Sequence, residues 1–516
     1  MKFIAGFVFL AWGAAAWGGP RINQEGRILG PAPVVAQPVL FNTAQADAVV
    51  AAMQIMPVTS AWNEDVSRLP LLANSDAMIA QITGDLAANR RTLRAFYEMN
   101  YVLVPDSQPA QSIRFFNYPG ESDLEGGTSP NGLYPLPPNL PVETWPNQTG
   151  ALTLAQWQQD VNSTGGDRHA IMVKPGAGFI WETWLTKFAS GAWQASNGAK
   201  FDLKANTLRP AGWTSGDAAG LPMFPALVRF DECERGMVEH AVRLVVKRTR
   251  VGPIYPATHQ ASVGSTTSPD IPAMGQRLRL KATFVIPATW TKQEKAVCLG
   301  LKKYGGIVAD NGGFLSFSVC PDDRFPANAF GNLSTIAISN FEVVQSTGAT
   351  QGPRAPGAPN ASAGGEQTIP FGAVAALQGS VSAPGATPVV QWKKYAGPGT
   401  VSFGSAAQAA TTASFSLPGS YALLLSADDG THAVAFDAVT VNVVLAAEGT
   451  ASNNDFVVHF PTLPGRSYQL EESTDLAPAS WTTVANNLSG DGSFFHVPVT
   501  GALSKGRAFY RVKVLP

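Results

Sequence analysis

The sequence predicts a mainly β protein: an N-terminal β-sandwich or jelly-roll-like domain with a few helices, followed by two small β-sandwich modules. The chain holds 50 Gly and 39 Pro in 516 residues and only 14% charged residues, a composition typical of β-rich, loop-rich proteins. Short runs with a two-residue apolar period alternate with turn residues along most of its length. The chain is also too long for one hydrophobic core, which predicts several domains.

The chain opens with a pattern typical of a secretory signal peptide. Lys2 precedes the apolar run 3–17, and small residues follow it. We therefore expect residues 1–18 to be removed and the protein to be secreted, either to the cell exterior or to the periplasm and cell surface. No later run reaches the roughly 18–20 apolar residues that cross a bilayer, so no membrane span is expected.

The net charge and the motifs argue against several classes of function. A net charge of -1 and a pI near 6.6 argue against nucleic acid as a partner. The histidines lack metal-ligand spacing, and neither a nucleophile elbow nor a phosphate-binding or dinucleotide-binding loop is present. We expect no cofactor and no metal, and a chain that acts as a monomer.

Three helices are predicted in the N-terminal domain. Thr43 is a suitable cap for a helix over 44–56, and a second apolar stripe predicts a helix over 75–88. Thr291 and Glu294 form a capping-box pattern that opens a third helix, which Gly305 should end.

Two predicted hairpins carry ionisable side chains on apolar-aligned faces. The first covers 169–184, with a turn over 175–178 and with His169 and Glu182 aligned with apolar neighbours. Each residue is either a satisfied strand-end or edge residue or part of a functional sheet face. The second hairpin joins strands over 226–230 and 237–246 through the acidic turn at 231–234. His240 lies on its apolar face, where it is either a core residue or a catalytic one.

The remainder of the domain is predicted as strands over 277–286, 314–320 and 335–344, with a tight turn at 310–312. Cys298 and Cys320 could form a disulfide, which would leave Cys233 free. The domain should close near residue 348. A Pro/Gly/Ala linker over 349–367 follows, then β-modules over 368–445 and 446–516.

Several runs carry a resemblance to known groups of proteins. The runs FDLKANTLRPAGWTSGDAAGLPMFPALVRFDE, HAVRL, YPATHQAS and LKKYGGIVADNG resemble a group of uncharacterised secreted bacterial proteins over about residues 60–345. The runs WKKYAGPGTVSF, PGSYALLLSADDG and VTVNV resemble PKD and immunoglobulin-like domains of secreted bacterial enzymes. The last block, with SYQLEESTDLAPASWTTV and RAFYRVKV, is similar to a small C-terminal β-module of secreted proteins. These resemblances imply an extracellular setting and no particular reaction.

Acids in loops and on strand faces, with tryptophans near some of them, favour a glycoside hydrolase that cleaves polysaccharide with paired carboxylates. Its partner would be a polysaccharide or a cell-surface glycan. The catalytic candidates are Glu182, Asp217, Asp231, Glu232, His169, His240 and His259, and Asp310 is a further acid. Of these, His169, Glu182, Glu232, His240 and His259 are expected to gather on one concave face or rim. The candidate substrate-binding residues are Trp181, Trp184, Trp213 and Arg229.

Two alternatives stay open. The first is a non-catalytic surface, adhesion or glycan-binding protein, since β-modules accompany adhesins too. The second is a polysaccharide lyase, in which a histidine removes a proton beside a uronate carboxylate. In the lyase, the carboxylate would be neutralised by Arg229, Arg243 or Lys281.

Overall fold

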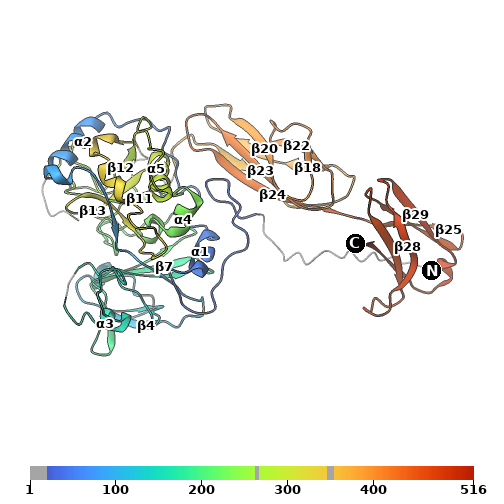
Figure 1. Cartoon of the computed structure of the whole chain (residues 1–516), viewed down its shortest axis with the longest axis horizontal. Helices are drawn as coiled ribbons and strands as arrows, with labels where there is room; N and C mark the ends of the chain where they lie inside the picture. Colours follow the sequence, from blue (N-terminus) through green and yellow to red (C-terminus); the bar gives the residue numbers. More distant parts are fainter. Residues whose placement is uncertain (1–19, 164–165, 262–265, 346–353, 516) are drawn as a thin grey trace.

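The computed structural model describes residues 20–163, 166–261, 266–345 and 354–515 (Figure 1). The predicted signal peptide lies outside the described residues. Strands hold 34% of the residues and helices 13%, which confirms the mainly β prediction. None of the helices within the described ranges is both long and apolar enough to cross a membrane.

The first part of the N-terminal region is a sandwich of two sheets. The five-stranded sheet has the order β1 (Val39–Leu40), β3 (Val102–Leu103), β6 (Ala170–Lys174), β7 (Phe179–Trp184), β10 (Asn197–Asp202). The four-stranded sheet has the order β5 (Asn131–Tyr134), β4 (Gln111–Phe115), β9 (Ala192–Ala195), β8 (Lys187–Ala189). Phe115, Met172 and Trp193 belong to the buried cluster that these strands share. β6 and β7 pair antiparallel, which confirms the hairpin predicted over 169–184.

The second part is built on a six-stranded sheet. Its order is β15 (Phe341–Val343), β12 (Arg277–Leu280), β13 (Gly306–Asn311), β11 (Val242–Val246), β14 (Leu315–Val319), β2 (Leu93–Tyr97). The pairs β11/β13 and β14/β2 are parallel, whereas a jelly roll is antiparallel. β11 lies between β13 and β14, so the two strands joined by the turn at 312–314 do not pair with each other.

The α-helices are α1 (Ala44–Ala51), α2 (Ser75–Gly84), α3 (Leu154–Gln159), α4 (Phe230–Arg235) and α5 (Lys292–Lys303). Thr43 caps α1 by accepting a bond from the Ala46 amide, and the predicted Thr291 capping box opens α5. α1 and α2 are shorter than predicted. The 3-10 helices are η1 (Ala88–Arg90), η2 (Pro119–Glu121), η3 (Phe224–Ala226), η4 (Gly331–Thr335), η5 (Ile338–Asn340) and η6 (Ala502–Ser504).

The hairpin predicted around residue 232 is wrong. Its first strand and acidic turn are replaced by η3 and α4, and only β11 remains of its second strand. Asp231 pairs with Arg235 and Arg229 with Glu232, at spacings of four and three residues, which bring side chains together on a helix. Gly236 ends α4 in a left-handed conformation, with φ of 98°.

Two other predicted strands are also wrong in extent. The strand predicted over 277–286 ends at Leu280 as β12, because the chain then turns: Lys281 N–H bonds the Asn340 carbonyl and Phe284 N–H bonds the Lys281 carbonyl. The segment 335–344 contains η5 and the three-residue β15 in place of one long strand.

The second module holds nine strands in three small sheets around buried Trp392 and Tyr421. They are β16 (Asn360–Ser362), β17 (Gln367–Pro370), β18 (Ala375–Gln378), β19 (Ser380–Ser382), β20 (Val389–Ala396), β21 (Val401–Phe403), β22 (Ala410–Phe415), β23 (Gly419–Asp428) and β24 (Ala435–Val444). β16 pairs with β19, and Ala363 lies in the module's core. The linker predicted over 349–367 is therefore shorter, since its last part belongs to this module.

The third module has two three-stranded sheets that enclose their own core (Figure 1). One has the order β25 (Glu448–Ser452), β26 (Asp455–Pro461), β29 (Phe494–Val499), and the other β28 (Thr482–Ser489), β27 (Ser467–Ser473), β30 (Phe509–Leu515).

The disulfide considered between Cys298 and Cys320 does not form. All three cysteines are free and buried. Cys298 lies in α5 and Cys320 directly follows β14. Burial raises the pKa of Cys298 to about 12 and that of Cys320 well above its ordinary value, so neither is an activated nucleophile.

Candidate functional site

Around β11, β14 and β2, the six-stranded sheet has one apolar face and one more polar face. Side chains alternate along a strand, so Leu244, Phe317 and Ala95 share the face that packs on the core. The opposite face, called the polar face here, carries Arg94, Phe96, Glu98, Arg243, Val245, Asp310, Ser316 and Ser318.

Arg243 is the centre of this face. Its Nε donates to Asp217 Oδ2 at 2.8 Å, while its Nη2 donates both to Asp217 Oδ1 at 3.1 Å and to Asp310 Oδ2 at 2.7 Å. Burial would lower the pKa of Arg243, but Asp217 and Asp310 outweigh burial and raise it. The guanidinium therefore stays charged and ties the loop that carries Asp217 to the sheet.

His169 and Glu143 form a buried pair beside this arginine. His169 Nδ1 lies 2.9 Å from Glu143 Oε2, and Nε2 lies 2.8 Å from the Gly216 carbonyl oxygen. Burial would lower the pKa of His169, but the Glu143 carboxylate outweighs it and raises the value to about 9. At neutral pH the ring is therefore an imidazolium that donates to both oxygens and holds the 214–224 loop.

Glu182 supports the same loop from β7. Its carboxyl oxygens accept bonds of 2.9–3.0 Å from the amides of Met223 and Phe224, and the residue has no solvent exposure. Burial raises the pKa of Glu182 to about 7. Because no substrate can reach Glu182, we interpret it as a positioning residue.

Glu98, like Glu143, is a residue that no sequence pattern indicated. It directly follows β2, and its Oε1 accepts a 2.6 Å bond from the Ser318 hydroxyl. Burial raises the pKa of Glu98 to about 7, although the positive charge of Arg243 acts in the opposite direction. Glu98 is only partly buried, so a ligand on the polar face could reach it.

These residues together form what we call the Arg243 cluster: Glu98, Glu143, His169, Glu182, Asp217, Arg243 and Asp310. The side chain of Asp310 is 27% exposed, against 1% for Asp217 and 4% for Arg243. The cluster therefore opens to solvent at Asp310 and Glu98, while its other members hold these two in place.

The remaining predicted acids and His240 form a separate Glu232 cluster, made of Arg229, Asp231, Glu232, Arg235 and His240. Arg229 Nη2 lies 2.6 Å from Glu232 Oε1, and His240 Nε2 lies 3.1 Å from Glu232 Oε2. Burial would raise the pKa of Glu232, but Arg229 and His240 hold it at about 2. An adjoining cavity of only about 30 Å³ leaves room for little more than water.

The predicted single gathering of His169, Glu182, Glu232, His240 and His259 stays a prediction, because the bonds divide its members: His169 and Glu182 belong to the Arg243 cluster, and Glu232 and His240 to the Glu232 cluster. Among the described residues, no hydrogen bond or ion pair joins the Glu232 cluster to the Arg243 cluster. The physical reason is that α4 replaces the predicted hairpin and turns Glu232 toward Arg229.

The other predicted site residues lie around the 214–224 loop or away from it. His259 is partly buried, with Nδ1 2.6 Å from the Ala218 carbonyl oxygen. Trp181 is buried between the two sheets of the sandwich. Trp184 stacks on Tyr118, and Trp213 lies under the guanidinium of Arg209. None of these three tryptophans belongs to the polar face.

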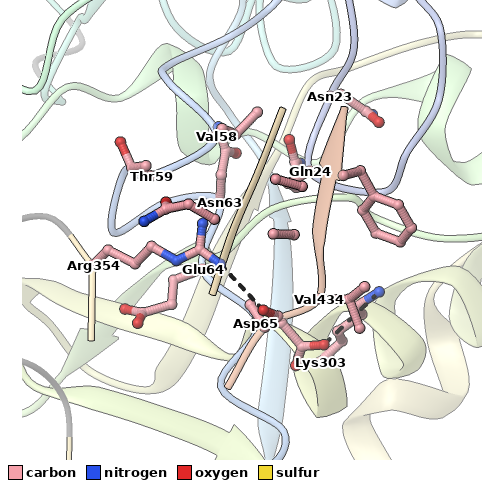
Figure 2. A pocket seen from close by; sticks show the side chains of 15 residues that line it. Asn23, Gln24, Val58, Thr59, Asn63, Glu64, Asp65, Lys303, Arg354 and Val434 are labelled. Carbon is pink, nitrogen blue, oxygen red and sulfur yellow. Dashed lines mark hydrogen bonds and ion pairs between the residues drawn. The ribbon is translucent and has the colours of Figure 1, made fainter. Parts of the chain in front are cut away.

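A polar cavity of about 150 Å³ lies between the N-terminal region and the second module (Figure 2). Lys303 Nζ lies 2.6 Å from Glu25 Oε1, and Glu64 accepts a 2.9 Å bond from the Ala355 amide. Near the cavity, Arg68 pairs with Asp428 of the second module at 2.5 Å. We interpret the cavity as a polar contact zone between the two parts.

Comparison of the chain with models of protein families gives no match, and neither does comparison with curated proteins. Within the described ranges, no three His, Cys, Asp or Glu side chains are grouped so that they could hold a metal ion.

Stability should fall as pH rises toward 9, because of His169. Its folded pKa of about 9 exceeds its ordinary value of 6.5. Its stabilising contribution is thus complete below about pH 6.5 and is lost as pH rises through about 9. Burial raises the pKa values of Glu98 and Glu182 from 4.5 to about 7. The fall in stability that these two groups cause therefore comes earlier, as pH rises from about 4.5 to about 7.

Urea unfolding at intervals from pH 6.5 to 9.5 measures this effect. We expect the midpoint to fall across that window in the wild type and to stay nearly level in His169→Asn. His259→Asn is the control, since His259 has no carboxylate partner among the described residues. A wild-type midpoint that does not change with pH would contradict the His169–Glu143 ion pair.

Proposed function

We propose that the chain is a secreted glycoside hydrolase that acts on polysaccharide, with Asp310 and Glu98 as its two reacting carboxyl groups. The observation that carries the proposal is their placement on one sheet face, on either side of Arg243. Arg243 bonds Asp310 directly, and the charges of Arg243 and Glu98 act on each other.

The two carboxyls have the different environments that glycoside cleavage needs. Arg243 bonds the Asp310 carboxylate at 2.7 Å, whereas burial raises the pKa of Glu98 to about 7 and keeps part of its population protonated near neutral pH. In the proposed reaction, Glu98 donates its proton to the glycosidic oxygen as that bond breaks. Asp310 accepts a proton from the water that attacks the anomeric carbon.

The strand order favours the inverting form of this reaction. β13 and β2 are separated by β11 and β14, and neighbouring strands lie about 4.8 Å apart. Three such steps place the two strands about 14 Å apart, and each side chain leans toward the strands between them, Asp310 to Arg243 on β11 and Glu98 to Ser318 on β14. We propose that this leaning brings the carboxyls to the roughly 6.5–9.5 Å of inverting enzymes, wider than the roughly 5–5.5 Å of retaining ones. The wider spacing leaves room for the attacking water.

The other predicted catalytic residues take supporting parts in this proposal. Asp217, His169 and Glu182 position the 214–224 loop and Arg243, because all three are buried and bonded. The modules over 360–515, which resemble accessory domains of secreted enzymes, would hold the catalytic region near an insoluble or surface-bound glycan.

The alternatives receive less support. Of the three histidines considered for a lyase, His169 and His240 have both ring nitrogens bonded and so cannot remove a substrate proton, which leaves His259, bonded at Nδ1 to the Ala218 carbonyl. Glycan binding without catalysis is the second candidate. It is favoured by the close charge compensation of Asp217 and Arg243, which is typical of structural networks.

A polysaccharide panel tests the proposal. Reducing-end release and ultraviolet absorbance are followed together on neutral, uronate-containing and sulfated polymers. We expect reducing ends without the unsaturated sugar that a lyase leaves, and NMR of the first product should give the inverted anomer. Ultraviolet absorbance would establish a lyase, and binding without release would establish a non-catalytic glycan-binding protein.

A further inference from the structure

One end of the polar face gathers cations that no carboxylate balances. The guanidinium carbons of Arg90 and Arg94 lie 4.6 and 5.9 Å from the centroid of the Phe314 ring. Lys247 directly follows β11, the strand that pairs with β14, and its position is exposed. Among the described residues, none of these three cations forms an ion pair, so their charge is available to a ligand.

This cationic patch, defined as Arg90, Arg94 and Lys247 around Phe314, adjoins the proposed reacting groups. The turn 312–314 leads directly from β13, which carries Asp310, to Phe314. A Cβ on Gly313 would meet Arg90 Nη1 at 2.8 Å, so the glycine allows the guanidinium to lie against the turn. The patch and the Arg243 cluster are therefore parts of one surface.

Aromatic rings lie between the cations and the proposed catalytic groups. Phe96 is 37% exposed, and its ring centroid lies 5.6 Å from that of Phe314 at a steep angle. Phe96 and Glu98 share the polar face of the sheet. An extended ligand that starts at the cations would thus pass an apolar ring before it reaches Glu98.

We propose that the cationic patch binds the anionic groups, carboxylate or sulfate, of an acidic polysaccharide that lies along the polar face. Guanidinium groups match the geometry of such anions, and aromatic rings accept the apolar faces of sugars. The whole chain has a net charge of -1, so the positive charge is local to this end of the sheet. This inference names the substrate class for the proposed function and rests on it for the reaction.

Nucleic acid is the less suitable occupant. The patch has three unpaired cations, whereas nucleic-acid binding draws on many phosphate contacts. Sugar polymers with spaced anionic groups fit one short positive region beside uncharged rings.

Calorimetric titration of the full chain tests the proposal with four polymers: polygalacturonate, dextran sulfate, neutral dextran and single-stranded DNA of matched charge. The test variant is Arg94→Gln/Lys247→Gln, and Arg90→Gln, at an exposed position, provides an independent variant. The matched control is Arg114→Gln/Lys393→Gln, which removes two exposed cations elsewhere. We expect the test variant to weaken binding of the preferred acidic polysaccharide about tenfold, and the control to leave it unchanged.

Preference for polygalacturonate would identify carboxylate as the anionic group, and preference for dextran sulfate would identify sulfate. The proposal is overturned if dextran binds as tightly as both acidic polymers, if DNA binds as tightly, or if the control loses as much affinity as the test variant. Patch-dependent binding without cleavage of any polymer would refute the proposed hydrolase alone. Cleavage of neutral polymers without binding of acidic ones would refute this inference alone.

Discussion

Asp310→Asn should lower kcat on the cleaved polysaccharide by roughly 10³-fold, within the range for loss of a general base. The amide oxygen of asparagine can still accept a bond from Arg243, so the cluster should stay assembled. It cannot take the proton of the attacking water. Initial rates of reducing-end release measure the effect, and KM should change little because Asp310 acts mainly in the transition state.

Asp47→Asn is the matched control for this variant. Asp47 is also a partly exposed carboxylate bonded to an arginine, Arg324, but it lies on α1 away from the polar face. Its replacement should leave kcat unchanged. If Asp310→Asn and Asp47→Asn have equal rates, Asp310 takes no part in the reaction.

Arg243→Met should destabilise the protein by about 3–5 kcal/mol, the usual cost of leaving a buried carboxylate without its partner. Asp217 is 2% exposed and takes bonds from two nitrogens of this one guanidinium. Methionine fills a similar volume but donates no hydrogen bond. Urea unfolding at pH 7 measures the loss.

Two further variants identify the cause. Arg324→Met removes an arginine whose side chain is 32% exposed, so its ion pairs should contribute less than about 1 kcal/mol. Arg243→Met combined with Asp217→Asn should recover part of the stability, since the buried charge is then gone. A loss for Arg243→Met no larger than that for Arg324→Met would show that the buried ion pair is not stabilising.

Local features of the fold were predictable because they depend on neighbouring residues. The capping box at Thr291 and the turn over 175–178 act within a few residues, so both α5 and the β6–β7 hairpin agree with the prediction. α4 was not predictable from alternation alone. Its ion pairs at i,i+3 and i,i+4 spacing favour a helix over a hairpin only once Glu232 and Arg229 are buried together.

The strand order also depended on contacts that sequence periodicity does not contain. The turn signal at 310–312 predicts that the flanking strands pair with each other, yet β11 lies between them. That insertion places Arg243 beside Asp310, 67 residues later in the chain. The site is therefore a product of tertiary structure.

For the same reason, only some of the site residues could be recognised from the sequence. His169, Glu182 and Asp217 stand out as ionisable groups in apolar or glycine-rich surroundings, and the structure gathers all three around one loop. Glu98 carries no such signal, since it follows β2, a strand that no clear alternation predicts. Its importance emerges from the Ser318 bond and from its raised pKa.

The pH dependence of kcat/KM tests most directly whether the polar face is a hydrolytic site. Glu98 has to be protonated to act as general acid, so the wild type should lose activity above about pH 7, the pKa of Glu98. Glu98→Gln should be at least about 100-fold slower and should lack this decline. A decline near pH 7 that persists unchanged in Glu98→Gln, or a wild type that cleaves no polysaccharide at any pH, would contradict the account.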